Sequence, residues 1–145
     1  MSDAPEIRPF ALADEPAVVA LWEAAGLTRP WNDPHRDVAR KLEVQREWFL
    51  VACLGDRVVG SVMAGYDGHR GSVYYLAVEP QLHRRGIGRA LMAEVERLLG
   101  EAGCPKLNLV VRGDNAQALG FYAHLGYRVD DVVSLGKRLR DDVPR

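Results

Sequence analysis

Apolar positions follow two different spacings along this chain, and each change of spacing marks an expected element. Apolar residues recur at helical spacing after residue 14 and after residue 86, whereas β-prone apolar runs fill 49–54, 57–64 and 72–78. The pattern predicts strands over 5–10, 49–54, 57–64, 72–78 and 106–111, further β-prone sequence from 127 to about 139, and helices over 15–25, 34–48, 86–102 and 114–125. This order, β-α-α-β-β-β-α-β-α-β, is typical of a mixed α/β domain.

Turn and cap residues mark where these elements end. Asp14 is a candidate N-cap for the first helix, and Asp33 followed by Pro34 predicts the start of the second, which we expect to run to about Trp48. Gly55-Asp56 between two apolar runs predicts a tight hairpin. The polar tail 141–145 is expected to fray.

Length and charge exclude several classes of protein. The 145 residues suit one domain over 1–145, and 19 Lys and Arg balance 20 Asp and Glu to a net charge of −1. That balance argues against a dedicated nucleic-acid binder, which needs an excess of positive charge. The sequence shows neither a signal-peptide pattern nor the ~18-residue apolar run of a membrane span. We therefore expect a cytoplasmic protein with no membrane and no nucleic-acid partner.

The two cysteines do not suggest a metal site. Cys53 and Cys104 lie far apart and match no metal-ligand spacing, so we expect them to be core or strand thiols and expect no bound metal.

A basic, glycine-containing turn between the third meander strand and the next helix is the most informative stretch. The strand ends at Pro80, and Gly86 and Gly88 precede a helix with an apolar face. The first amides of a helix have no carbonyl partner and can bind phosphate, and glycine lets a ligand approach the backbone closely. Three arginines, Arg84, Arg85 and Arg89, add positive charge. The turn therefore predicts a diphosphate site.

Other interpretations of this turn are a dinucleotide-binding fold, a P-loop and a purely structural turn. A dinucleotide-binding fingerprint needs a third glycine where Leu91 stands, and no P-loop string occurs in the chain. The glycines could also serve only to make a sharp strand-to-helix turn.

Two blocks of sequence carry a family resemblance. His83-Arg84-Arg85-Gly86-Ile87-Gly88 resembles motif A of the GNAT acetyltransferase superfamily, Gln/Arg-x-x-Gly-x-Gly/Ala, with His83 at the Gln/Arg position. The stretch 115–127 resembles the superfamily's Asn-x-x-Ala-x-x-Phe-Tyr-x-x-x-Gly-Phe/Tyr block. The loops 29–34 and 65–71 also resemble an uncharacterised bacterial branch, the YpeA-like acetyltransferases.

The resemblance implies a GNAT-type α/β fold, with a mostly antiparallel, twisted central sheet flanked by helices and splayed at the strand that ends near Val78. It implies an N-acetyltransferase that takes the acetyl group from acetyl-CoA, with a primary amine attacking the thioester directly. The pyrophosphate of the donor would lie on His83, Arg84, Arg85, Gly86, Ile87, Gly88 and Arg89, and its pantetheine arm on the backbone of Leu76, Ala77 and Val78.

Two residues of the second block have alternative roles. By the resemblance, Tyr122 protonates the leaving thiolate, a role that suits a phenol with a reference pKa of ~10. The alternative is an interfacial aromatic whose hydroxyl is satisfied locally. Asn115 either contacts the coenzyme or caps its helix.

The general base is not identified by the resemblance. The positions where relatives often carry a carboxylate are Ser72 and Val110 here, and neither can act as one. Asp33, Asp67, His69, Glu79 and a chain of waters remain open, each with an ordinary structural alternative. By the family layout, Trp31, Asp33, Asp67 and His69 flank the acceptor groove, where carboxylates would favour a cationic amine.

Two further expectations follow. Because those base positions lack carboxylates, a non-catalytic module that binds acyl-CoA is the alternative function. The chain could also form a homodimer, as many relatives do.

Overall fold

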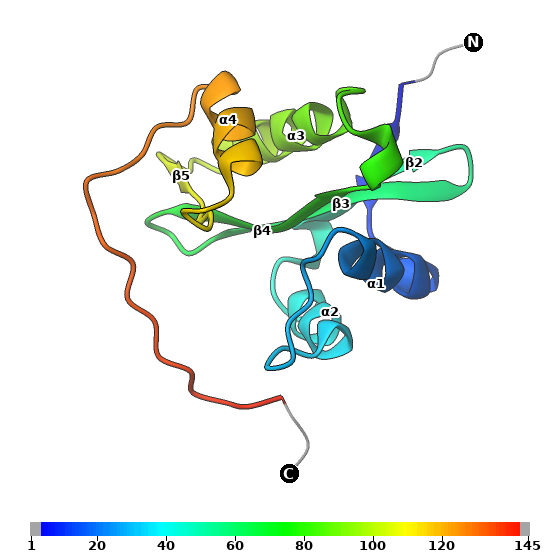
Figure 1. Cartoon of the computed structure of the whole chain (residues 1–145), viewed down its shortest axis with the longest axis horizontal. Helices are drawn as coiled ribbons and strands as arrows, with labels where there is room; N and C mark the ends of the chain where they lie inside the picture. Colours follow the sequence, from blue (N-terminus) through cyan, green and yellow to red (C-terminus); the bar gives the residue numbers. More distant parts are fainter. Residues whose placement is uncertain (1–3, 143–145) are drawn as a thin grey trace.

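The computed structural model describes residues 4–142, and in it a five-stranded sheet separates two layers of helices (Figure 1). The strands lie in the order β1-β2-β3-β4-β5, all antiparallel except the parallel pair β4 and β5. The strands are β1 (Glu6–Pro9), β2 (Phe49–Leu54), β3 (Arg57–Tyr66), β4 (Gly71–Val78) and β5 (Leu107–Asn108). The helices are α1 (Glu15–Ala24), α2 (Pro34–Leu42), α3 (Ile87–Glu101) and α4 (Ala116–His124), with single 3-10 turns at Leu12–Asp14, Arg46–Trp48 and Pro80–Leu82.

Each face of the sheet has its own apolar core. Helices α3 and α4 cover one face, and α1 and α2 cover the other (Figure 1). The α3 face buries Leu50, Val59, Val62, Ile87, Leu91, Met92, Val95 and Leu99, and the α1 face buries Val18, Trp22, Val38, Phe49, Val51 and Met63. The predicted α/β fold, a mostly antiparallel sheet flanked by helices, is confirmed.

One extra residue in β4 changes the direction of that strand. Met63 pairs with Tyr74 and Ser61 with Ala77, so two steps along β3 face three along β4. The bulged residue is Tyr75, whose φ of 55° lies in the left-handed region. Its ring stacks on Trp22 with centroids 3.8 Å apart.

Hydrogen bonds hold this bulge from both sides. The Trp22 indole donates to Ser61 Oγ over 2.8 Å, and that hydroxyl donates to the Tyr75 carbonyl over 2.9 Å. The Tyr75 hydroxyl donates to Asp37 on α2 over 2.6 Å. Because burial and the neighbouring Asp37 carboxylate disfavour the phenolate, the pKa of Tyr75 is raised and its proton stays in place.

The splay between β4 and β5 is also confirmed. Their pairing is limited to Gly71 with Leu107 and Ser72 with Asn108, after which the two strands diverge. The strand expected over 106–111 is therefore only two residues long. Beyond Ser72, the outer backbone edge of β4 has no strand partner within residues 4–142.

The predicted hairpin and the predicted N-cap positions are present in the structure. The hairpin at Gly55-Asp56 joins β2 to β3, and Asp33 caps α2 by accepting from the His35 amide over 2.9 Å. Asp14 occupies the N-cap position of α1, but its carboxylate instead pairs with Arg8 at 2.8 Å and accepts from the Ala11 amide.

The predicted length of the second helix is wrong. Helix α2 ends at Leu42 rather than near Trp48, because Gln45 turns the backbone into the left-handed region with a φ of 51°. The Gln45 side chain then accepts from the Tyr66 amide over 3.0 Å and donates to the Tyr66 carbonyl over 2.9 Å. These two bonds are the ones that a neighbouring strand would otherwise make.

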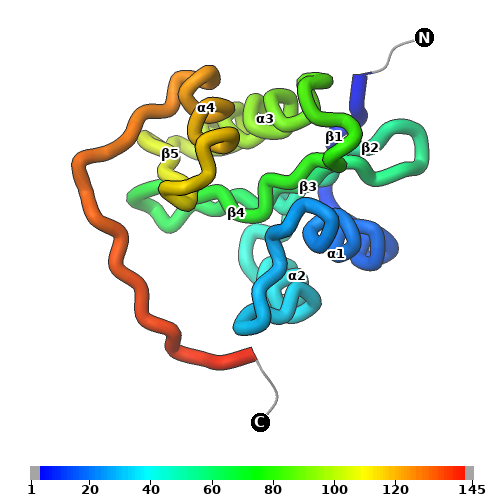
Figure 2. Tube along the Cα trace, viewed as in Figure 1, coloured from blue at the N-terminus to red at the C-terminus, as the bar shows by residue number. Residues whose placement is uncertain are grey.

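The predicted C-terminal elements are wrong as well. Residues 128–142, which we call the strap, form no strand but run as an extended trace from α4 to α2 (Figure 2). The tail is not frayed at its described end, because the Asp142 side chain is buried against Arg40. Residues 143–145 of that expected tail lie outside the described residues.

The close packing of α3 on Gly60 of β3 gives a stability prediction. A methyl group at Gly60 would lie 3.0 Å from Leu91, 3.1 Å from Ile87 and 3.2 Å from the Ala77 carbonyl. We expect Gly60→Ala to lower the free energy of unfolding by about 1–3 kcal/mol, measured by urea denaturation.

Gly100 is the matched control, because a methyl group there meets nothing within 4 Å in α3. Gly100→Ala should raise the free energy of unfolding by up to about 1 kcal/mol. Equal effects of the two substitutions would contradict this account of the packing.

Candidate functional site

The loop between β4 and α3 presents a run of unpaired backbone amides. Within residues 4–142, the backbone amides of residues 84–89 donate to no carbonyl group outside α3. The next amide, that of Ala90, donates to the Gly86 carbonyl over 3.0 Å. Arg84 and Gly86 both have left-handed backbone, with φ of 69° and 80°. Turns of this kind point successive N–H groups to one side and bind anions, and the positive end of the helix dipole adds to the field.

The two glycines of this loop have different tasks. Gly86 needs its positive φ, while a methyl group there would meet nothing within 4 Å. Gly88 lies beneath the Phe121 ring, and a methyl group there would be 3.2 Å from that ring. Gly86 therefore shapes the turn, and Gly88 lets α4 pack closely on the first turn of α3.

The same loop and the first turn of α3 carry three charged side chains. Arg84, Arg85 and Arg89 are all exposed. His83 lies 3.2 Å from the Val78 carbonyl through Nε2, and since a carbonyl only accepts, this nitrogen carries the proton. His83 thus ties the loop to the end of β4, next to the unpartnered edge of Leu76, Ala77 and Val78.

A groove opens where β4 and β5 diverge. It has a volume of about 280 Å³ and is lined by Asp67, Arg70, Gly71, Ser72, Val73, Tyr74, Asn108, Leu109 and Val110. Tyr74 and Val110 are 60% and 74% exposed there. Both positions where relatives often carry a base, Ser72 and Val110, line this groove, although neither is ionisable.

Tyr122 lies on α4 among other aromatic rings. It meets Phe121 and Tyr127 edge to face, with centroids 5.0 and 5.6 Å away. Its hydroxyl has no hydrogen-bond partner in the described part of the chain and keeps some contact with solvent. Burial raises the pKa of Tyr122 to about 12, so the phenol stays protonated at neutral pH.

Asn115 caps α4, because its side chain accepts from the Ala118 amide over 3.0 Å. The capping role is thus confirmed, and a contact with coenzyme remains a prediction.

Comparison with known proteins agrees with this geometry. Residues 17–127 match the Acetyltransferase (GNAT) family. The chain belongs to the GNAT acetyltransferase family. An acetyltransferase of Pectobacterium atrosepticum is 51% identical over 137 residues, which cover 94% of this chain and 97% of that one.

Solved structures share the acetyltransferase fold. Ard1 from Thermoplasma volcanium is 26% identical, covers 88% of this chain and 84% of its own, and gives a TM-score of 0.72. AAC(6')-Iy, in complex with the bisubstrate analog CoA-S-monomethyl-acetylneamine, is 18% identical, covers 92% and 98%, and gives a TM-score of 0.76.

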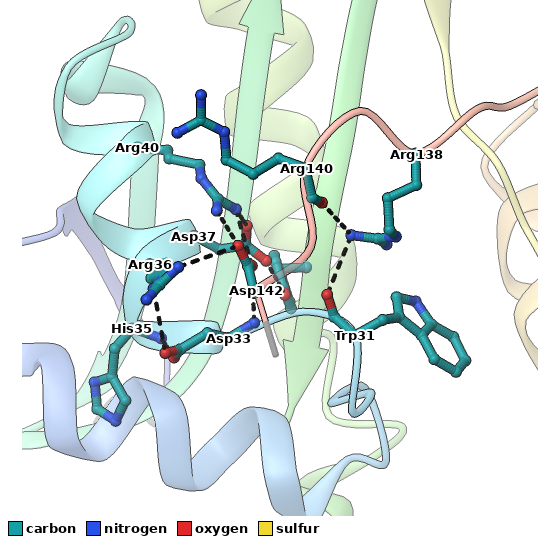
Figure 3. Close-up of polar contacts among 10 residues, drawn as sticks. Trp31, Asp33, His35, Arg36, Asp37, Arg40, Arg138, Arg140 and Asp142 are labelled. Carbon is teal, nitrogen blue, oxygen red and sulfur yellow. Dashed lines mark hydrogen bonds and ion pairs between the residues drawn. The ribbon is translucent and has the colours of Figure 1, made fainter. Parts of the chain in front are cut away.

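The four acceptor-side candidates of this acetyltransferase separate into two places. Asp67 lines the groove, and His69 is exposed on the same turn. Trp31, 43% exposed, and Asp33 lie instead beside the far end of the strap, where the Asp33 amide donates to Asp142 over 3.0 Å (Figure 3). The structure does not bring all four residues together.

Asp67 is held as an anion. Its Oδ1 accepts from the amides of Arg70 and His69, each over 2.8 Å, and these bonds lower the pKa of Asp67. A carboxylate with a lowered pKa is a poor proton acceptor at neutral pH but a good partner for a cation. The other open candidate, Glu79, is already paired with Arg57.

Several residues of the site give no local signal in the sequence. Tyr75 and Tyr74 sit in a plain β-prone run, and only the register with β3 shows that one forms the bulge and the other lines the groove. The hydrogen bond from Tyr127, which lies just after α4, to Glu96 on α3 has a length of 2.6 Å and joins residues 31 positions apart. Within residues 4–142, no group of three or more His, Cys, Asp or Glu side chains could hold a metal, and no helix could cross a membrane.

Asn115 allows capping and coenzyme contact to be separated. Asn115→Ala removes the cap and should lower the free energy of unfolding by about 1 kcal/mol. Asn115→Asp keeps a capping oxygen but adds a negative charge at the start of α4, which would repel an anionic coenzyme that contacts this position. It should preserve the melting temperature while weakening acetyl-CoA binding in calorimetry, and unchanged affinity would leave Asn115 as a cap only.

Proposed function

We propose that this GNAT acetyltransferase binds acetyl-CoA across the 84–89 loop and the open edge of β4, and acetylates a primary amine by direct transfer. The observation that carries the proposal is the adjacency of unpaired loop amides, exposed arginines and an unpartnered strand edge, joined by His83 and Val78. An anion followed by an extended amide-containing arm is the ligand that such a surface fits.

The donor would be held mainly by backbone. The amides of 84–89 and the three arginines suit a pyrophosphate, and the free edge of Leu76, Ala77 and Val78 suits the amides of a pantetheine arm. When bound, acetyl-CoA supplies the acyl group as an activated thioester.

Tyr122 would act as the general acid. The amine nitrogen forms a bond to the acyl carbon, the bond from that carbon to sulfur breaks, and Tyr122 gives its proton to the departing thiolate. A phenol with a pKa of about 12 is fully protonated beforehand but is a weak acid. We therefore assign it an effect near the lower end of the general-acid range, about 10²-fold.

The acceptor would approach through the groove beside Asp67. An alkyl ammonium, with a pKa near that of Lys at ~10.4, is attracted by this anion and must lose a proton before attack. The pKa of Asp67 is lowered, and Ser72 and Val110 are not bases. We therefore assign water in the groove as the acceptor of the proton that the ammonium loses.

The absence of a carboxylate at Ser72 and Val110 also favours a second candidate, a module that binds acyl-CoA without turnover. Thiol release from acetyl-CoA across polyamines, amino acids, aminoglycosides and peptides separates the two. Binding by calorimetry with no thiol release for any amine would favour the module.

We further propose that residues 1–145 act as one domain in the cytoplasm, as a homodimer. Both apolar cores lie on one shared sheet, which supports a single domain. Cys53 and Cys104 are free thiols, which suits a reducing compartment.

Tyr122→Phe tests the general acid directly. It removes one hydroxyl and leaves the ring packing in place, so kcat should fall about 10²-fold while the Kd for acetyl-CoA stays nearly unchanged. Thiol-release kinetics and calorimetry measure the two quantities.

Tyr127→Phe is the matched control, because Tyr127 contacts the same ring and its hydroxyl is bonded to Glu96. It should lower thermal stability with little effect on kcat. A Tyr122→Phe enzyme with full kcat but weak acetyl-CoA binding would contradict the assigned role.

Asp67→Asn tests the attraction of a cationic acceptor. Asparagine keeps the Oδ1 acceptor for the two turn amides and removes the charge, so KM for the amine should rise several-fold with kcat retained. Asp33→Asn, away from the groove, should leave that KM unchanged. If Asp67→Asn leaves KM unchanged for every amine that the enzyme accepts, Asp67 does not attract the acceptor.

A further inference from the structure

The strap leaves an unusual amount of apolar surface uncovered. Its apolar residues are between 76% and 91% exposed, namely Val129, Val132, Val133, Leu135 and Leu139. Exposed apolar residues are normal when scattered, but a contiguous row of them in an ordered segment marks a contact surface.

The backbone of the strap is also unpartnered. Residues 129–139 take part in no backbone-to-backbone hydrogen bond with any residue from 4 to 142, although the chain is extended there (Figures 1 and 2). An extended segment with free amides and carbonyls is a template for another strand.

Both ends of the strap are fixed to the body of its own chain. At the start, Asp130 accepts from Lys106 Nζ at 3.0 Å and from Asn108 Nδ2 at 2.7 Å, both beside β5. Near the end, Arg138 donates to the Trp31 carbonyl over 3.1 Å (Figure 3).

The last contact is the tightest. The Asp142 side chain is only 1% exposed and meets Arg40, Arg36 at 3.8 Å and the Asp33 amide at 3.0 Å (Figure 3). These partners lower the pKa of Asp142 to about 2, so the contact persists at physiological pH. Residues 131–137 therefore connect the contacts of Asp130 at β5 to the contacts of Arg138 and Asp142 beside α2.

The sequence of the strap is complementary to itself when two copies run antiparallel. With Ser134 opposite Ser134, Asp131 faces Lys137 and Val133 faces Leu135. The same register sets Val129 against Leu139 and Asp130 against Arg138. Opposite charges and apolar residues directly across an antiparallel pair are favourable. Arg128 would face Arg140, so the favourable pairing ends where the strap meets the body.

We propose that the strap is the contact surface for a second copy of this chain, with the two straps paired antiparallel over 129–139 about a two-fold axis at Ser134. A two-fold axis makes every cross-strap pair except Ser134 with Ser134 occur twice, so Asp131 and Lys137 contribute two ion pairs to the dimer. Within a single chain, the side chains of Asp131 and Lys137 form no hydrogen bond or ion pair with any residue from 4 to 142.

Charge reversal across the axis tests this pairing in the full-length protein. Asp131→Lys alone, or Lys137→Asp alone, places like charges opposite each other at two positions. Each variant should sediment as one chain where the wild type sediments as two, with a dimer dissociation constant raised about tenfold or more. Circular dichroism checks that each variant is folded, and Asp56→Lys on the exposed β2–β3 turn is the control, which should remain dimeric.

Mixing the two single variants makes the test specific. In a mixed pair, the new lysine of one chain faces the new aspartate of the other, so equal amounts should form a heterodimer that neither variant forms with itself. The double variant Asp131→Lys, Lys137→Asp should also recover the dimer. A wild type that is monomeric over the whole concentration series, single variants that stay dimeric, or a mixture that stays monomeric would each overturn the proposal.

Discussion

The bulge at Tyr75 is the constraint on which the rest of the structure depends. A left-handed, non-glycine residue inside a strand is costly, and it persists only where its surroundings hold it in place. Here the Trp22 ring, the Ser61 hydroxyl and the Asp37 carboxylate all act on that one residue. The bulge re-aims β4 as it passes β5, and the free edge of β4 and the groove beside it follow from the divergence of the two strands.

This origin explains why so much of the proposed site is backbone. The loop amides, the strand edge and the Val78 carbonyl are present whatever side chains stand at those positions, provided that the bulge and the Gly86 turn form. The buried core on the α1 face thus supports the proposed donor site through the bulge, without lining that site. In the proposed mechanism, side-chain chemistry is limited to two residues, Tyr122 and Asp67.

Features with a short-range cause could be predicted from the sequence. Gly86, the Gly55-Asp56 hairpin and the Asp33 and Asn115 caps act within a few residues, and all take the predicted conformation. The end of α2 depends on Gln45 bonding Tyr66, and the bulge depends on α1 and α2 packing against β4. The strap has a strand-like composition but no strand partner within the described residues. In these cases the deciding contact lies far away in the sequence, so no local pattern contains it.

The contact between Asp142 and Arg40 has a consequence for the response of the protein to acid. The two residues are 102 positions apart in the sequence, and the partners of Asp142 lower the pKa of its carboxyl to about 2. A carboxyl whose pKa is lowered by folding contributes stability that is complete above its unfolded pKa and is lost as the pH falls through its folded pKa. The end of the strap is therefore released from α2 only at a pH near 2, below the range in which ordinary carboxyls take up protons.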